Sequence, residues 1–84
     1  MILTNDGVNV YPNPIEGLLA VDIKNLQEKQ EASLVLFDLK GQLVVSRKRL
    51  QTNNQIDFTN TPLGTYVLRV TIDKKTTESK IIKI

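Results

Sequence analysis

The chain has 84 residues, which is enough for one domain with one modest hydrophobic core. It contains no cysteine and no histidine. This excludes a disulfide framework, a thiolate metal site and the most common general base, so the sequence predicts a protein that is not an enzyme and carries no cofactor or metal. The formal net charge of +2 is too small to indicate a nucleic acid or an anionic membrane as partner.

The first residues do not resemble a targeting segment. Residues 1–7 lack a basic region and a sustained apolar stretch, so we predict a linker or an expression remnant rather than a signal peptide. No segment approaches the roughly 18 apolar residues that a membrane span requires. Either an export signal lies upstream on a longer parent chain, or the domain is cytoplasmic. The folded domain is predicted to span residues 8–84.

The first strand, which begins near Val8, is predicted to end at a pair of prolines. In Tyr11-Pro12-Asn13-Pro14 each proline lacks a backbone N–H and holds the preceding residue extended. Such a segment can finish an edge strand but cannot continue as a central one.

Three later segments alternate between apolar and polar residues with a period of two, which is typical of half-buried strands. Their core-facing residues are predicted to be Leu19, Val21, Ile23, Ile56, Phe58, Tyr66, Leu68, Val70 and Ile72. A fourth segment, 32–37, is apolar at nearly every position, so either Leu34 and Leu36 or Val35 and Phe37 can face inward. We favour the first pair. This segment and residues 43–45 also allow an exposed patch that a parent domain or a second copy would cover, although burial by neighbouring loops is the simpler expectation.

Three turns connect these strands. Asp38–Gly41 is predicted to form a hairpin turn, because the Asp carboxylate can accept backbone N–H bonds and glycine tolerates a positive φ. Thr61–Gly64 is predicted to form a type I turn that starts the next strand. A weaker turn without glycine, Asp73–Lys75, precedes a final strand.

About seven short strands at near-regular spacing predict an all-β fold, an immunoglobulin-like Greek-key β-sandwich without a disulfide. The paired cysteines and the buried tryptophan of antibody domains are absent. A small open barrel is the alternative.

Four short motifs in this order resemble a known family. They are Tyr-Pro-Asn-Pro after the first strand, aliphatic-Phe-Asp-x-x-Gly in mid-chain, Leu-Gly-x-Tyr-aliphatic before a long strand, and Lys-Ile-Ile-Lys at the end. The chain is similar to the C-terminal sorting domain of cargo proteins of the type IX secretion system (the Por secretion system, type A), over residues 8–84. The resemblance assigns the following sorting-motif residues: Tyr11, Pro12, Asn13, Pro14, Asp38, Gly41, Gly64, Tyr66, Lys80 and Lys83.

The resemblance implies a non-catalytic address label at the end of a larger exported protein. Such cargo enters the periplasm by a signal peptide, its folded tail is read by an outer-membrane translocon, and a sortase-like peptidase commonly removes the tail at the cell surface. The implied partners are the translocon, the peptidase and the N-terminal cargo domain. The implied location is the periplasm in transit, then the cell surface or the medium.

Most sorting-motif residues also have a structural explanation. The prolines stop a strand, the glycines serve turns, and Tyr66 is a core aromatic whose hydroxyl should find a backbone partner near the rim. Recognition is therefore expected at an exposed edge and at the C-terminal strand. There Ile82 and Ile84 are predicted to face the core, with Ile81 and Lys83 outward, because burying Lys83 is unfavourable.

A terminal edge strand presents unpaired N–H and C=O groups to which a partner can add a strand. In this hypothesis Lys80 and Lys83 prevent self-pairing and guide the domain to an acidic receptor. The same edge allows weak self-association.

The alternative function is a carbohydrate-binding or adhesive module appended to a secreted enzyme. Sugar platforms usually need exposed aromatic rings. The aromatic residues are Tyr11, Phe37, Phe58 and Tyr66, and at least two of them are needed for the core. Arg47–Arg49 alternates between two faces without an interleaved aromatic, so no nucleic-acid partner is predicted.

Overall fold

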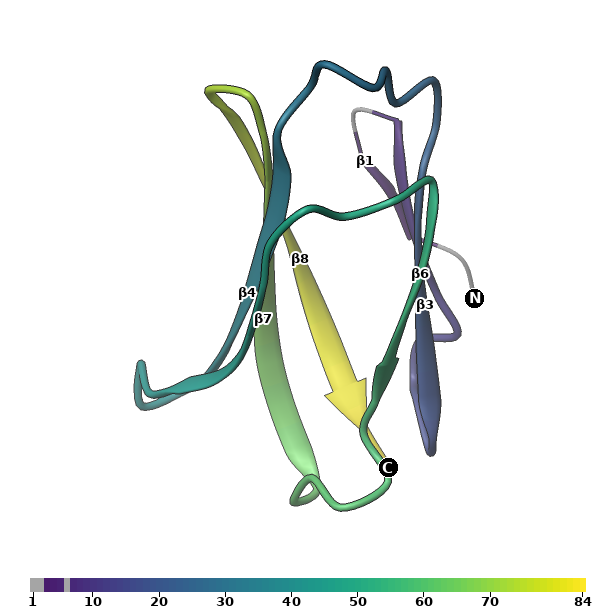
Figure 1. Cartoon of the computed structure of the whole chain (residues 1–84). Coiled ribbons are helices and arrows are strands. Elements are labelled where there is room, and N and C mark those ends of the chain that lie inside the picture. The colour runs from purple at the N-terminus through teal and green to yellow at the C-terminus, as the bar shows by residue number, and fades with distance from the viewer. Residues whose placement is uncertain (1–2, 6) are drawn as a thin grey trace.

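The computed structural model describes residues 3–5 and 7–84, and this part of the chain consists of strands, turns and loops. The strands are β1 (Leu3–Asn5), β2 (Val8–Tyr11), β3 (Leu18–Ile23), β4 (Ala32–Asp38), β5 (Leu43–Arg47), β6 (Asn53–Asp57), β7 (Gly64–Ile72) and β8 (Lys75–Lys83). They form two antiparallel four-stranded sheets in the orders β1-β2-β3-β6 and β5-β4-β7-β8, which stack as two layers (Figure 1). Among the described residues there is no helix long and apolar enough to cross a membrane.

The strand order is that of an immunoglobulin-like sandwich. β2, β3 and β6 form one sheet, β4, β7 and β8 form the other, and the chain changes sheets after β3, β5 and β6. This confirms the predicted all-β sandwich without a disulfide. β1, which pairs with β2, comes from the segment expected to be a linker; residues 1, 2 and 6 of that segment lie outside the described residues.

β2 ends at Tyr11, as predicted, but it is an inner strand rather than an edge strand. β1 pairs with β2 only as far as Val10, and β3 pairs with it as far as Tyr11. Pro12 therefore lies beyond both ladders, where its missing N–H leaves no ladder bond unmade. The peptide bonds before Pro12 and Pro14 are both cis.

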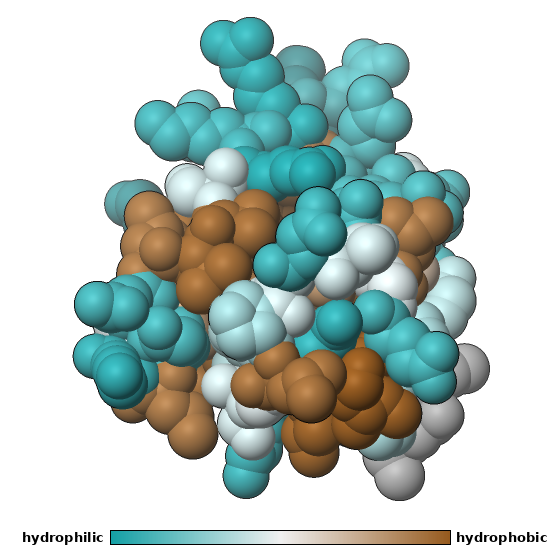
Figure 2. Space-filling view, turned by 90° about the horizontal axis from the view of Figure 1, so that it is seen from below, coloured by the Kyte–Doolittle hydropathy of each residue, from teal (hydrophilic) through white to brown (hydrophobic). Residues whose placement is uncertain are grey.

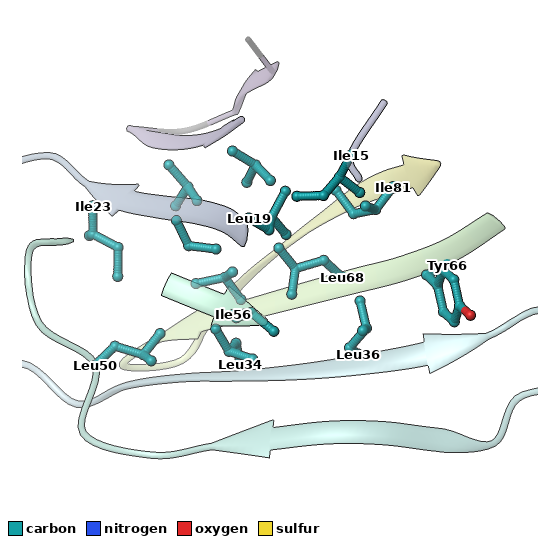
Figure 3. Close-up of a cluster of buried hydrophobic side chains, with 14 of the residues drawn as sticks. Ile15, Leu19, Ile23, Leu34, Leu36, Leu50, Ile56, Tyr66, Leu68 and Ile81 are labelled. Atoms are coloured by element: carbon teal, nitrogen blue, oxygen red, sulfur yellow. The ribbon is translucent and has the colours of Figure 1, made fainter. Parts of the chain in front are cut away.

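The core lies between the two layers and is built from alternate residues of the strands. Figure 3 shows side chains from both sheets, such as Leu19 and Leu68, pointing into the space between them. The buried apolar residues are Val8, Val10, Ile15, Leu19, Val21, Ile23, Ala32, Leu34, Leu36, Leu50, Ile56, Phe58, Tyr66, Leu68, Val70 and Ile81. The predicted inward residues of β3, β4, β6 and β7 are thereby confirmed, except that Ile72 is only half-buried.

The prediction for β8 is wrong, because its two faces are reversed. Ile81 is fully buried and Lys83 is 7% exposed, whereas Ile82 is 40% and Ile84 is 56% exposed. Lys83 fits on the inner side because it pairs with Gly64, which has no side chain. No buried side-chain nitrogen or oxygen in the described part of the chain lacks a partner, so the lysine buries its aliphatic stem while its ammonium group reaches the surface.

Candidate recognition site at the motif end

The sorting-motif residues come from separate segments that the fold brings to one end of the sandwich. Asp38 pairs with Tyr66 across β4 and β7, and Gly64 pairs with Lys83 across β7 and β8. Ile15, which directly follows Pro14, forms a parallel bridge with Lys83. This end, the lower one in Figure 1, also holds the C-terminus. We call it the motif end, and it comprises residues 11–18, 38–44, 58–66 and 80–84.

Asn13 joins the first motif to the last. Its side chain is buried, its Nδ2 donates to the carbonyl of Lys80 at 2.8 Å, and its Oδ1 accepts from the N–H of Ile82 at 2.9 Å. The N–H of Ile15 donates to the carbonyl of Ile82 at 2.8 Å, and the N–H of Ile84 donates to the carbonyl of Ile15 at 2.9 Å. The Asn13 amide thus takes the place of a strand backbone and, with Ile15, covers the outer edge of β8.

This arrangement overturns the hypothesis that a partner strand adds along the end of β8. β8 is the edge strand of its sheet, as expected. However, the outward carbonyl of Lys80 and both backbone groups of Ile82 are already hydrogen-bonded to residues 13–15. Lys83 cannot guard that edge either, because its stem is buried, whereas Lys80 is exposed.

Tyr66 closes the motif end on the side of β7. Its hydroxyl donates to the carbonyl of Pro62, and its ring meets Phe58 edge-on with 5.7 Å between the centroids. Burial raises the pKa of the Tyr66 hydroxyl, and the nearby Asp38 carboxylate adds to this effect. The arrangement is the tyrosine corner of immunoglobulin-like sandwiches, in which a tyrosine near the start of strand F, here β7, donates a hydrogen bond to the preceding loop. The predicted backbone partner is confirmed.

Asp38 and Gly41 build the hairpin turn between β4 and β5, as predicted. Asp38 Oδ1 accepts from the N–H groups of Lys40 and Gln42, both at 2.9 Å, and Gly41 has a φ of 82°. The carboxylate therefore stabilises its own turn.

Gly64 starts β7 with a φ of 142°, a conformation that favours glycine. The hydrogen-bonded turn before it lies earlier than predicted, because the N–H of Thr61 donates to the carbonyl of Phe58 at 2.9 Å. Thr61 therefore closes that turn instead of opening one.

Two surface carboxylates near the motif residues have altered acidity. The Tyr11 hydroxyl donates to Asp22 Oδ2 at 2.5 Å, and Asn53 Nδ2 donates to Asp22 Oδ1 at 2.9 Å. These bonds hold the pKa of Asp22 below its ordinary value, and the same contact with Asp22 raises the pKa of Tyr11. Hydrogen bonds from Thr59, with a smaller effect of the Lys83 charge, lower the pKa of Asp57.

The motif end also collects exposed apolar side chains, which sequence reasoning did not identify as a group (Figure 2). The exposed large hydrophobic residues between 7 and 84 are Leu18, Leu39, Leu43, Val44, Leu63, Ile82 and Ile84, and all of them lie at this end. Three of them, Leu39, Val44 and Leu63, line one open groove beside Tyr66. The opposite end carries the mainly polar loops 24–31 and 73–74. The sequence signal for this group was a leucine within each of two turns, Leu39 in Asp38–Gly41 and Leu63 just before Gly64.

The fold and the motif end define a small sandwich whose recognisable residues are displayed at one end. The family model of the secretion system C-terminal sorting domain matches residues 9–84. The chain therefore belongs to the family of type IX secretion C-terminal sorting domains and carries a sorting signal for export across the outer membrane. Membership implies interaction with the secretion system and with a parent cargo chain. A comparison with curated proteins found no match.

Proposed function

We propose that the chain is a non-catalytic signal that directs a larger cargo protein through the outer-membrane translocon of the type IX system and is normally cleaved at the cell surface. The observation that carries this proposal is the convergence of the sorting-motif residues on one end of a folded domain that matches the family over nearly its whole length. The N-terminal cargo domain, the translocon and the sortase-like peptidase are the proposed partners.

The signal in this proposal is a surface of the folded domain rather than an unfolded tail. Asn13 and Ile15 hold residues 80–84 in one register, and only this register turns Ile82 and Ile84 outward. Tyr66 and Gly64 fix the neighbouring loop that carries the exposed Leu63. A translocon that recognises these side chains together would therefore select folded domains.

Three aspartates at or close to the motif end, Asp22, Asp38 and Asp57, have roles within the fold. Asp38 serves its turn, Asp22 bonds Tyr11 and Asn53, and Asp57 accepts from Thr59. A general acid or base needs a free group within reach of a bound substrate.

The carbohydrate-binding alternative would need aromatic rings exposed on the surface, and the four aromatic side chains do not provide them. Phe58 and Tyr66 are buried, the Arg69 guanidinium lies over the Phe37 ring at 5.5 Å, and Tyr11 bonds Asp22 through its hydroxyl. Stacking on a sugar needs a ring face that is free on the surface. No observation therefore favours this second function.

The test is a fusion of a signal peptide and a folded reporter to residues 1–84 in a host with a type IX system. We expect the reporter outside the cells with the fusion, and in the periplasm when the domain or the translocon is missing. A reporter that stays in the periplasm despite the intact domain would contradict the proposal. Deleting residues 80–84 is unsuitable as a test, because it removes the fully buried Ile81.

Cleavage is tested on the same exported reporter by intact mass. We expect a mature product without residues 8–84. An exported reporter that still carries the whole domain would show that this signal is not removed.

A further inference from the structure

The outer faces of the two sheets differ in chemistry. On the β1-β2-β3-β6 sheet the outer side chains of β2, β3 and β6 are mostly polar, and Tyr11, Asp22 and Asn53 are hydrogen-bonded to one another there. Leu18 is the exposed large aliphatic residue of this face. Such a polar outer face is normal for an antiparallel sheet with one side in water.

The β5-β4-β7-β8 sheet instead carries an apolar side chain on the outer face of each strand. Leu43 of β5 pairs with Phe37 of β4, and Phe37 pairs with Val67 of β7. Ile82 of β8 lies diagonally next to Val67, because Val67 pairs with Lys80. We call Leu43, Phe37, Val67 and Ile82 the outer apolar row.

The two ends of the outer apolar row are accessible, while the Arg69 guanidinium lies over the Phe37 ring in its middle. Leu43 is 58% and Ile82 is 40% exposed, while Phe37 and Val67 are half-buried. A continuous apolar row across a whole sheet face is uncommon on a protein surface without a partner. Leu43 and Ile82 belong to the motif end, so a partner that reads the sorting-motif residues would also reach the row.

The charges around the row indicate the chemistry of its partner. Arg69 and Glu78 share this face and form a salt bridge with 2.8 Å between Nη2 and Oε2. Lys80 lies on the same face opposite Val67, is exposed and has no ion-pair partner among the described residues. The face therefore has an excess positive charge beside an apolar row.

We propose that the outer apolar row is the surface on which the secretion machinery docks, and that the docking protein presents an apolar face with a carboxylate placed against Lys80. This inference rests on the proposed function and adds the chemistry of the partner. A second copy docked through the same row would bring two Lys80 ammonium groups into one interface, which is unfavourable. A partner with a carboxylate fits better.

The test uses Leu43→Asn in the reporter fusion, with Gln55→Ala as a control, because Gln55 is exposed on the outer face of the other sheet and lies outside the motif end. Truncating one apolar contact that becomes buried in an interface lowers affinity by about tenfold. We therefore expect about tenfold less exported reporter with Leu43→Asn and wild-type export with Gln55→Ala. Thermal unfolding of both variants checks that the fold is intact. If Leu43→Asn unfolds, Val67→Thr, which is close in shape, replaces it.

Substitutions of Lys80 test the charge part of the proposal independently. Lys80→Glu should lower export and Lys80→Arg should retain it, because only the first reverses the charge that meets the carboxylate. Wild-type export of folded Leu43→Asn and Lys80→Glu would overturn the docking proposal. A wild-type fusion that is not exported would instead contradict the proposed function, so the two failures are distinguishable.

Self-association is examined by sedimentation velocity of the isolated domain. We expect a monomer. A wild-type dimer that Leu43→Asn dissociates, together with unchanged export, would show that the row is an interface between copies and would overturn the proposal.

Discussion

Replacing Asn13 by alanine should detach the end of β8 from the segment that covers it. The substitution removes the donor to the Lys80 carbonyl and the acceptor of the Ile82 N–H, both in a site where Asn13 is only 7% exposed. Each hydrogen bond contributes about 0.5–1.5 kcal/mol net, so the expected loss in free energy of unfolding is about 2 kcal/mol. For a domain of this size that corresponds to a fall in melting temperature of roughly 8–16 °C.

Chemical denaturation measures the global loss, and amide hydrogen exchange shows where it occurs. We expect the Ile82 N–H to exchange roughly 30-fold faster in Asn13→Ala, in line with about 2 kcal/mol. Asn60→Ala, at an exposed turn position, is the control and should change stability by less than about 0.5 kcal/mol. Unchanged stability together with unchanged exchange at Ile82 would refute the idea that Asn13 holds β8.

Two further predictions concern the hydrogen bonds of the tyrosines. Tyr66→Phe should destabilise the domain by about 1 kcal/mol in chemical denaturation, because the Pro62 carbonyl loses its donor while the ring stays packed. Tyr11→Phe should cost less, because Tyr11 is half-exposed. An equal cost of the two substitutions would contradict the role of the tyrosine corner. Because the pKa of Asp22 is lowered in the folded state, its stabilising contribution is present above the ordinary pKa and is lost as the pH falls below it. Asp22→Asn should therefore show a smaller loss of stability between neutral pH and acid than the wild type, and identical pH profiles would contradict this assignment.

The sandwich could be predicted because its inner strands alternate clearly. Leu19, Val21 and Ile23 of β3 alternate with Ala20, Asp22 and Lys24, which favours one inner face, and the burial confirms it. The turn at Asp38–Gly41 was equally specified, since a carboxylate and a glycine stand where the turn needs them. Local patterns of this kind depend only on residues close in sequence.

The end of β8 could not be predicted in the same way. Lys80–Ile84 has apolar residues in both phases, and the choice depends on Gly64, which leaves room beside Lys83, and on Asn13. These partners are distant in the sequence. Asn13 nevertheless stands out in the sequence, because both flanking prolines lack a backbone N–H and the Asn13 side-chain amide is the donor of that segment.

The gathering of exposed leucines at one end also could not be predicted from the sequence. Leu39 and Leu63 belong to different turns, and only the pairing of Asp38 with Tyr66 brings those turns together. The expectation that neighbouring loops bury the 43–45 segment is wrong at Leu43 and Val44, which remain exposed. Leu43 is exposed because β5 is the edge strand of its sheet and its partner Phe37 also points outward.

The most direct measurement of whether the secretion system reads the motif end is site-specific photo-crosslinking in cells that are exporting the reporter fusion. A photoreactive residue placed at Leu63, at the motif end, should form an adduct with an outer-membrane component of the type IX system. The same residue at Glu28, in the exposed loop at the opposite end, should not. Adducts from Glu28 without any from Leu63, in a fusion that is still exported, would contradict the account.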